Sequence, residues 1–144
     1  MTTNLTAEAR TTIEAPASTV WEALTKPEII KQYFFGTNVV TDWKVGSPIY
    51  YRGVWQGRPY EDKGVILEFE PPRKLVSTHW SPLAGVPDVP ENYHTITYLL
   101  DEHDGRTQIT LLQDNNASEE ERQHSEQNWN MMLASLKALL EGAA

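Results

Sequence analysis

The last quarter of the chain, residues 118–141, constrains the fold most, because it has the pattern of one long amphipathic helix. Ser118 and Glu121 have the spacing of a capping box, in which each side chain pairs with a backbone N–H of the first turn. Gly142 is placed to end the helix in a left-handed conformation. With a rise of about 1.5 Å per residue, the helix spans about 36 Å, roughly the width of a small domain. It therefore needs a broad surface to cover.

The apolar stripe of this helix is confined to its C-terminal half. Spacings of three and four residues place six apolar side chains on one face: Trp129, Met132, Leu133, Leu136, Leu139 and Leu140. Towards the N-terminus the same line passes through the polar residues His124, Ser125 and Asn128. We therefore expect one half of the helix to pack tightly and the other half to border solvent or a cavity.

Length and composition indicate a single soluble domain over residues 1–144. The chain has no cysteine, which excludes disulfides and thiolate metal sites, and no stretch that is long and apolar enough to span a bilayer. Its start lacks the features of a signal peptide, so we expect a cytoplasmic location. The net charge of −8 without a basic cluster argues against nucleic acid and anionic membrane surfaces as partners.

The rest of the chain has the alternation of strands, interrupted early by two short helices. Strands are expected at 5–14, 37–42, 49–55, 61–70, 74–81, 93–101 and 106–114, and helices at 17–24 and from about 25 to 34. Thr25 and Glu28 repeat the capping-box spacing at the second helix. In the strand 61–70, alternation places Val65, Leu67 and Phe69 on one side. The face of the strand 74–81 that points inward is left open.

This order of elements predicts an α+β fold, since the helices lie outside a run of antiparallel strands. A sheet with one apolar face needs a cover, and only the terminal helix carries a long enough apolar stripe. A twisted sheet of about seven strands curls as it grows, so it can wrap around that helix. The loop 81–90, with three prolines, is the longest irregular segment and of the kind that often borders functional sites.

Aromatic and polar residues on the expected strands are the candidates for a ligand cavity under the polar half of the helix. Aromatic side chains line apolar pockets, although a role in the core remains an equal alternative for those on the strands. The apolar candidates are Tyr51, Trp55, Tyr98, Trp129 and Met132, and the polar candidates are His79, His94 and Gln113.

Motifs for catalysis and for metal binding are missing from the sequence. The four histidines show neither an HxH nor an HExxH spacing, and there is no GxSxG elbow or glycine-rich phosphate loop. We therefore expect no metal and no cofactor. Glu119 to Glu121 are best explained as partners of the helix dipole, and Asp42, Glu61 and Asp62 as solvated residues near turns.

Four stretches of the sequence resemble the START-like superfamily, also called SRPBCC or helix-grip proteins. TIEAPASTVWEALTKPEII, residues 12–30, resembles the opening of the subgroup named after the activator of the heat-shock protein 90 ATPase. The hairpin containing ITYLL and the end containing NW, with leucines at 133, 136 and 140, resemble later segments of that subgroup. The segment DWKVGS, residues 42–47, is the fourth stretch. Ser47 in this segment and Asn128 before Trp129 stand where that subgroup usually has glycine.

The resemblance implies a seven-stranded antiparallel sheet gripping the C-terminal helix, with a cavity between them. It also implies a functional range that includes carriers of lipids and other hydrophobic ligands, polyketide cyclases and aromatases, and chaperone co-factors. No catalytic residues are common to that range. We carry no residue role over from it.

Three functional hypotheses follow. The first is the binding of a small hydrophobic or aromatic molecule between sheet and helix. The second is an enzyme of the cyclase or hydrolase type in the same cavity, with His79 or His94 as general base. The third is a protein-interaction role of the co-chaperone type, with a chaperone or a second copy of the chain as partner.

Overall fold

A computed structural model describes residues 5–34 and 36–142, except for the side chains of Trp55 and Ala84. In this part of the chain, seven strands and three α-helices follow one another in the expected order, and two short 3-10 helices lie between β5 and β6. The elements are β1 (Leu5–Ile13), α1 (Ala17–Thr25), α2 (Pro27–Tyr33), β2 (Asn38–Val40), β3 (Pro48–Trp55), β4 (Arg58–Glu70), β5 (Lys74–His79), η1 (Pro82–Ala84), η2 (Pro90–Asn92), β6 (His94–His103), β7 (Arg106–Asn116) and α3 (Glu119–Leu140). The predicted α+β architecture is confirmed.

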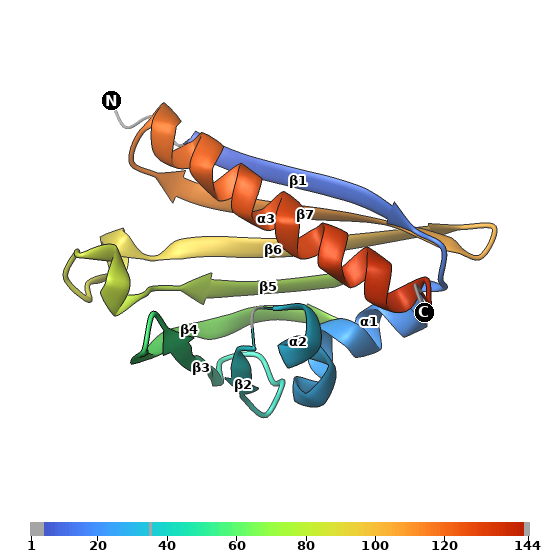
Figure 1. Cartoon of the computed structure of the whole chain (residues 1–144), viewed down its shortest axis with the longest axis horizontal. Coiled ribbons are helices and arrows are strands. Elements are labelled where there is room, and N and C mark those ends of the chain that lie inside the picture. The colour runs from blue at the N-terminus through green and yellow to red at the C-terminus, as the bar shows by residue number, and fades with distance from the viewer. Residues whose placement is uncertain (1–4, 35, 143–144) are drawn as a thin grey trace.

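The seven strands form one antiparallel sheet in the order β1-β7-β6-β5-β4-β3-β2. Every strand pairs with its sequence neighbour except β1, which pairs with β7. Figure 1 shows α3 crossing the sheet diagonally, from the end of β1 near the N-terminus to α1. Helix α1 lies beside the C-terminal end of α3, and α2 lies next to α1 (Figure 1). The long helix crosses one face of the seven-stranded sheet, as predicted for a helix-grip fold.

The main core lies under the C-terminal half of α3. Met132, Leu133 and Leu136 are buried there, and they join Ile13 and Ile109 of the sheet in one apolar cluster. Leu139, which the stripe predicted to be inward, is 37% exposed. The polar N-terminal half contributes no buried residue before Met132. The prediction of a helix packed tightly at one end only is therefore confirmed, with Leu139 as the exception.

The ends of α3 form as the sequence indicates. Oγ of Ser118 accepts a hydrogen bond of 3.1 Å from the backbone N–H of Glu121, and the Glu121 carboxylate accepts one of 2.7 Å from the N–H of Ala117. Gly142 has a φ of 65°, in the left-handed region. The capping box expected at α2 is wrong, because the Thr25 hydroxyl donates instead to the carbonyl of Trp21.

The expectation about the faces of β4 is decided by an irregularity in its pairing with β5. The register shifts between Ile66 and Glu68, so Ile66 is fully buried while Val65 and Leu67 are exposed. Phe69, beyond the shift, packs edge-on against Trp21 at a centroid distance of 5.3 Å. The prediction of one shared face for Val65, Leu67 and Phe69 is therefore wrong.

Strand β5 turns its odd-numbered side chains inward. Leu75 joins the apolar core cluster, and His79 lies against the ring of Tyr51. On the opposite face, Trp80 lies near Lys63, whose ammonium group is 5.7 Å from the indole centroid. The question of which face of residues 74–81 points inward is thereby answered, and His79 is directed to the side of the sheet that α3 covers.

Candidate functional site

A pocket of about 380 Å³ lies between the sheet and the polar half of α3. The sequence accounts for this space, because Ser125 and Asn128 stand where the apolar stripe would otherwise continue with large side chains. Both polar and apolar groups from β4, β5, β7, α3 and the residue that follows α2 surround it. Its lining residues are Phe34, Asp62, His79, Gln113, Ser125, Asn128, Trp129, Met131 and Met132. We call this space the main pocket.

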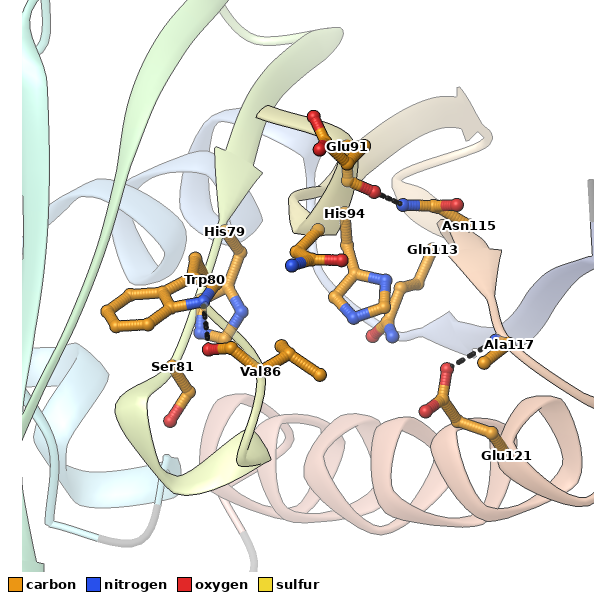
Figure 2. Close-up of a pocket in the computed structure, with 11 residues that line it drawn as sticks. His79, Trp80, Ser81, Val86, Glu91, His94, Gln113, Asn115, Ala117 and Glu121 are labelled. Atoms are coloured by element: carbon orange, nitrogen blue, oxygen red, sulfur yellow. Dashed lines mark hydrogen bonds between the residues drawn. The ribbon is translucent and has the colours of Figure 1, made fainter. Parts of the chain in front are cut away.

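A second pocket of about 270 Å³ lies beside it, where the chain between β5 and β6 faces the first turn of α3 (Figure 2). We call it the outer pocket. It is lined in part by His94, Val86 and Glu121, and it shares His79 and Gln113 with the main pocket. These two side chains therefore stand between the two spaces.

The segment between β5 and β6 is held in place by its own hydrogen bonds. The indole Nε1–H of Trp80 donates to the carbonyl of Val86 at 3.3 Å, as Figure 2 shows. The hydroxyl of Tyr93 donates to Asp88 at 2.6 Å, and the amide of Asn92 donates to the carbonyl of Pro87 at 2.9 Å. The proline-rich loop that the sequence singled out thus forms one wall of the outer pocket.

The deeper part of the interior is almost filled. A void of only about 20 Å³ remains among α2, β3, β5 and β6, where Tyr51 and Tyr98 meet Phe34. The ring of Phe34 stacks on Tyr51 at 6.3 Å and meets the indole of Trp129 edge-on at 6.0 Å. Phe34 therefore separates the nearly solid core from the main pocket.

An aspartate–histidine pair lies on the wall of the main pocket. Nε2 of His79 is 3.0 Å from Oδ2 of Asp62, and the two side chains are 27% and 16% exposed. A carboxylate only accepts, so Nε2 carries the proton and the other ring nitrogen is free to accept one. The ring of Tyr51 contacts His79 edge-on at 5.4 Å. The expectation that Asp62 is solvated is therefore wrong.

The close approach of β4 and β5 creates this pair. Gly64 lies so near β5 that a Cβ atom there would be 1.7 Å from the carbonyl oxygen of Thr78. No residue with a side chain fits that space without moving the backbone. The absent side chain lets the two strands come together beside Asp62 and His79.

Gln113 ties the polar half of α3 to the sheet. Its Oε1 accepts a hydrogen bond of 2.6 Å from Nε1–H of Trp129, and its Nε2 donates to Ser125 and Asn116 at 3.3 Å each. The Ser125 hydroxyl in turn donates to Asn116 at 3.0 Å. The amide of Gln113 is thus occupied by protein partners, although the side chain borders both pockets.

His94 lies at the outer pocket and points into it in Figure 2. Its Nδ1 is 2.8 Å from the backbone carbonyl of Asp114. A carbonyl oxygen only accepts, so Nδ1 carries the proton and Nε2 of the neutral ring is an acceptor. His94 can therefore accept a proton or a hydrogen bond on the outer side of the site.

The buried tyrosines keep their protons at neutral pH. Burial raises the pKa of Tyr51 to about 12, with the charge of Asp62 adding to the effect and a hydrogen bond with Ser77 opposing it. Burial also holds the pKa of Tyr98 well above its ordinary value. Both hydroxyls therefore act as neutral groups in this site.

The structure brings together only part of the candidate set. Trp129, Met132, His79 and Gln113 line the main pocket, and His94 lines the outer one. Tyr51 and Tyr98 border the small inner void, and the side chain of Trp55 lies outside the described residues. Sequence reasoning did not propose five residues of the main pocket as ligand contacts: Phe34, Asp62, Ser125, Asn128 and Met131.

The described residues contain neither a cluster of potential metal ligands nor a membrane-spanning helix. Within residues 5–34 and 36–142, no three or more histidine and carboxylate side chains gather in a way that could hold a metal ion. None of the helices in the described part of the chain is long and apolar enough to cross a bilayer.

The curved antiparallel sheet, the long covering helix and the pocket between them define the helix-grip class of START-like proteins. The chain belongs to the Activator of Hsp90 ATPase homolog 1-like protein family, whose sequence model matches residues 14–141. This confirms the resemblance found in the sequence. No curated protein matches the chain.

Solved structures share the same fold. The solution structure of ChR145 from Cytophaga hutchinsonii is 52% identical, with a TM-score of 0.87 over 99% of this chain and 98% of that one. CalU16 from Micromonospora echinospora is 26% identical, with a TM-score of 0.71 over 92% and 72%. The Aha1 dimer from Colwellia psychrerythraea, at 20% identity and a TM-score of 0.73 over 94% and 96%, shares the fold.

Proposed function

We propose that this chain, as a single helix-grip domain, binds a small hydrophobic or aromatic molecule in the main pocket. The observation that carries the proposal is the space of about 380 Å³ under the polar half of α3. Trp129, Met131, Met132 and Phe34 offer apolar contacts. Asp62, His79 and Ser125 offer polar contacts. Apolar walls with a few polar groups are typical of small-molecule sites.

A thermal-shift screen of hydrophobic and aromatic compounds tests this proposal. A ligand at a hundred times its dissociation constant should stabilise the folded state by about 2.7 kcal/mol. Asn128→Trp places a large ring in the pocket from an exposed position on α3, so it should abolish the stabilisation.

Asn130→Trp is the matched control, because Asn130 is also exposed on α3 but is not among the pocket residues. It should leave ligand binding intact. Failure of every compound to stabilise the protein, or equal loss of binding in both variants, would contradict the proposal.

The Asp62–His79 pair supports a second candidate, an enzyme acting on a molecule in the same pocket. The hydrogen bond of 3.0 Å holds the imidazole so that its other nitrogen can act as general base. Incubation of a bound compound with the wild type and with His79→Gln, followed by mass spectrometry, tests it. Turnover that persists in His79→Gln would remove His79 as the base. A chaperone or a second copy of the chain as partner stays a prediction from the sequence.

A further inference from the structure

Only one of the two carboxylate oxygens of Asp62 has a hydrogen-bond partner among the described residues. Its Oδ2 is paired with His79 at 3.0 Å, while its Oδ1 is buried and has no hydrogen-bond partner among the described residues. Buried polar atoms are almost always hydrogen-bonded, and leaving one unpaired is costly. Asp62 lines the main pocket, but Oδ1 itself is shielded, so a donor in the pocket reaches it only when the carboxylate turns.

Donors on neighbouring side chains are engaged elsewhere. The amide of Gln113 donates to Ser125 and Asn116, and the hydroxyl of Ser125 donates to Asn116. The nearby hydroxyl of Tyr51 makes no hydrogen bond with Oδ1 of Asp62, since Oδ1 has no partner among the described residues. Gln113 and Ser125 cannot donate to Oδ1 without breaking a bond that they already have.

The lining also determines which charge the pocket tolerates. Its residues include one carboxylate and no lysine or arginine. The imidazole of His79, the remaining basic group, is already bonded to Asp62. A ligand that ends in a carboxylate would place a second negative charge beside Asp62 in a partly desolvated site, where like charges repel strongly.

We propose that the ligand of the main pocket is an apolar molecule with an O–H or N–H group that donates to Asp62, and that the pocket rejects carboxylates. This inference rests on the proposed function, since it names the chemistry of the molecule bound there. The torsion between Cβ and Cγ of aspartate has a broad minimum, so a modest rotation presents Oδ1 to the pocket. Phe34, Trp129 and Met131 then contact the apolar body of the ligand. Alcohols, phenols and amines fit this description, and fatty acids do not.

Naphthol, its methyl ether and naphthoate form a matched set of probes, because they share one apolar body and differ in the polar end. Calorimetric titration of the wild type at neutral pH should show naphthol binding about tenfold or more tightly than the ether, and no binding of naphthoate. The ether lacks the donor and naphthoate carries the rejected charge. Equal affinities for naphthol and its ether would overturn the inference, and this comparison needs no variant.

Asp62→Asn tests whether this residue is the cause. It removes the charge with little change in volume, so the advantage of naphthol over the ether should fall to about twofold and naphthoate should gain affinity. Asp101→Asn makes the same charge change on an exposed residue of β6 and should leave the wild-type ranking unchanged. A ranking that survives Asp62→Asn, or that Asp101→Asn alters equally, would assign the selectivity to something else.

The outcomes separate this inference from the proposal beneath it. If none of the three probes binds, the proposed function fails for this class of ligand and the inference fails with it. If all three bind alike, the pocket is a binding site and only the inference about Asp62 is wrong.

Discussion

Nε1 of Trp129 in α3 donates a hydrogen bond of 2.6 Å to Oε1 of Gln113 in β7. This contact holds the polar half of the helix above the main pocket, at a place where few apolar contacts do so. The two residues come from the segments that the sequence predicted to face each other. Their pairing also explains why Gln113 borders the pocket while its amide is already occupied.

We expect Trp129→Phe to lower the free energy of unfolding by about 1–3 kcal/mol, because it leaves the Gln113 carbonyl without its donor. A double-mutant cycle with Gln113→Met isolates the pair, and urea denaturation measures all four proteins. The coupling energy should be about 0.5–1.5 kcal/mol. Purely additive effects would show that this hydrogen bond contributes nothing to stability.

Gly64→Ala should destabilise the protein by about 3 kcal/mol or more, because the new Cβ overlaps a backbone carbonyl of β5 that cannot move alone. Gly53→Ala is the control. Its Cβ would meet the end of the Tyr60 side chain at 2.6 Å, and a side chain can rotate away. Thermal denaturation of both variants measures the difference. Equal costs at the two glycines would refute the argument from backbone contact.

Alkaline pH should destabilise the fold through its buried tyrosines. The folded state raises the pKa of Tyr51 to about 12 from about 10 in an unfolded chain, so it favours the neutral hydroxyl. This contribution to stability is complete below about pH 10 and is lost as the pH rises towards 12. The fall in the free energy of unfolding over this range should be shallower in Tyr51→Phe. An unchanged slope in that variant would contradict the expectation, and absorbance titration of tyrosinate provides a second measurement.

Ser118→Ala should cost about 1 kcal/mol, because the N–H of Glu121 loses the hydroxyl that caps it. Ser135→Ala serves as the control, since Ser135 is exposed in the middle of α3 and alanine favours helices. It should be neutral or slightly stabilising. Chemical denaturation compares the two variants. If Ser118→Ala is as stable as the wild type, the Ser118 hydroxyl does not stabilise α3.

The sequence predicted the fold well where local rules apply. The cap at Ser118, the stop at Gly142 and the half-length stripe of α3 depend on neighbours along the chain, and each is confirmed. The pairing of β2 to β7 with their sequence neighbours follows from short connections, whereas the pairing of β1 with β7 does not. Family resemblance added the grip of sheet on helix, which the structure confirms.

The candidate site was less accessible to sequence reasoning, because its main features depend on contacts between strands. Asp62 looks solvated in sequence, and only the close approach at Gly64 brings it to His79. The register shift in β4 places Phe69 on the face opposite Val65 and Leu67, although simple alternation predicted one shared face. Neither the close approach of β4 and β5 nor the register shift can be predicted from the alternation along one strand. Alternation in β4 is equally compatible with Asp62, Gly64 and Ile66 facing inward. Considering that second possibility would have pointed to Asp62 as a pocket residue.

The pairing of β1 with β7 has a consequence for how the protein is made. Leu5 lies opposite Asn116, so the first strand emerges from the ribosome long before its partner exists. Until then, β1 exposes an unpaired edge, and α3, which covers it, is synthesised later still. Contacts so distant in sequence form slowly. The seven-stranded sheet can therefore be completed only after β7 has been synthesised, and until then the edge of β1 is open to pairing with other strands.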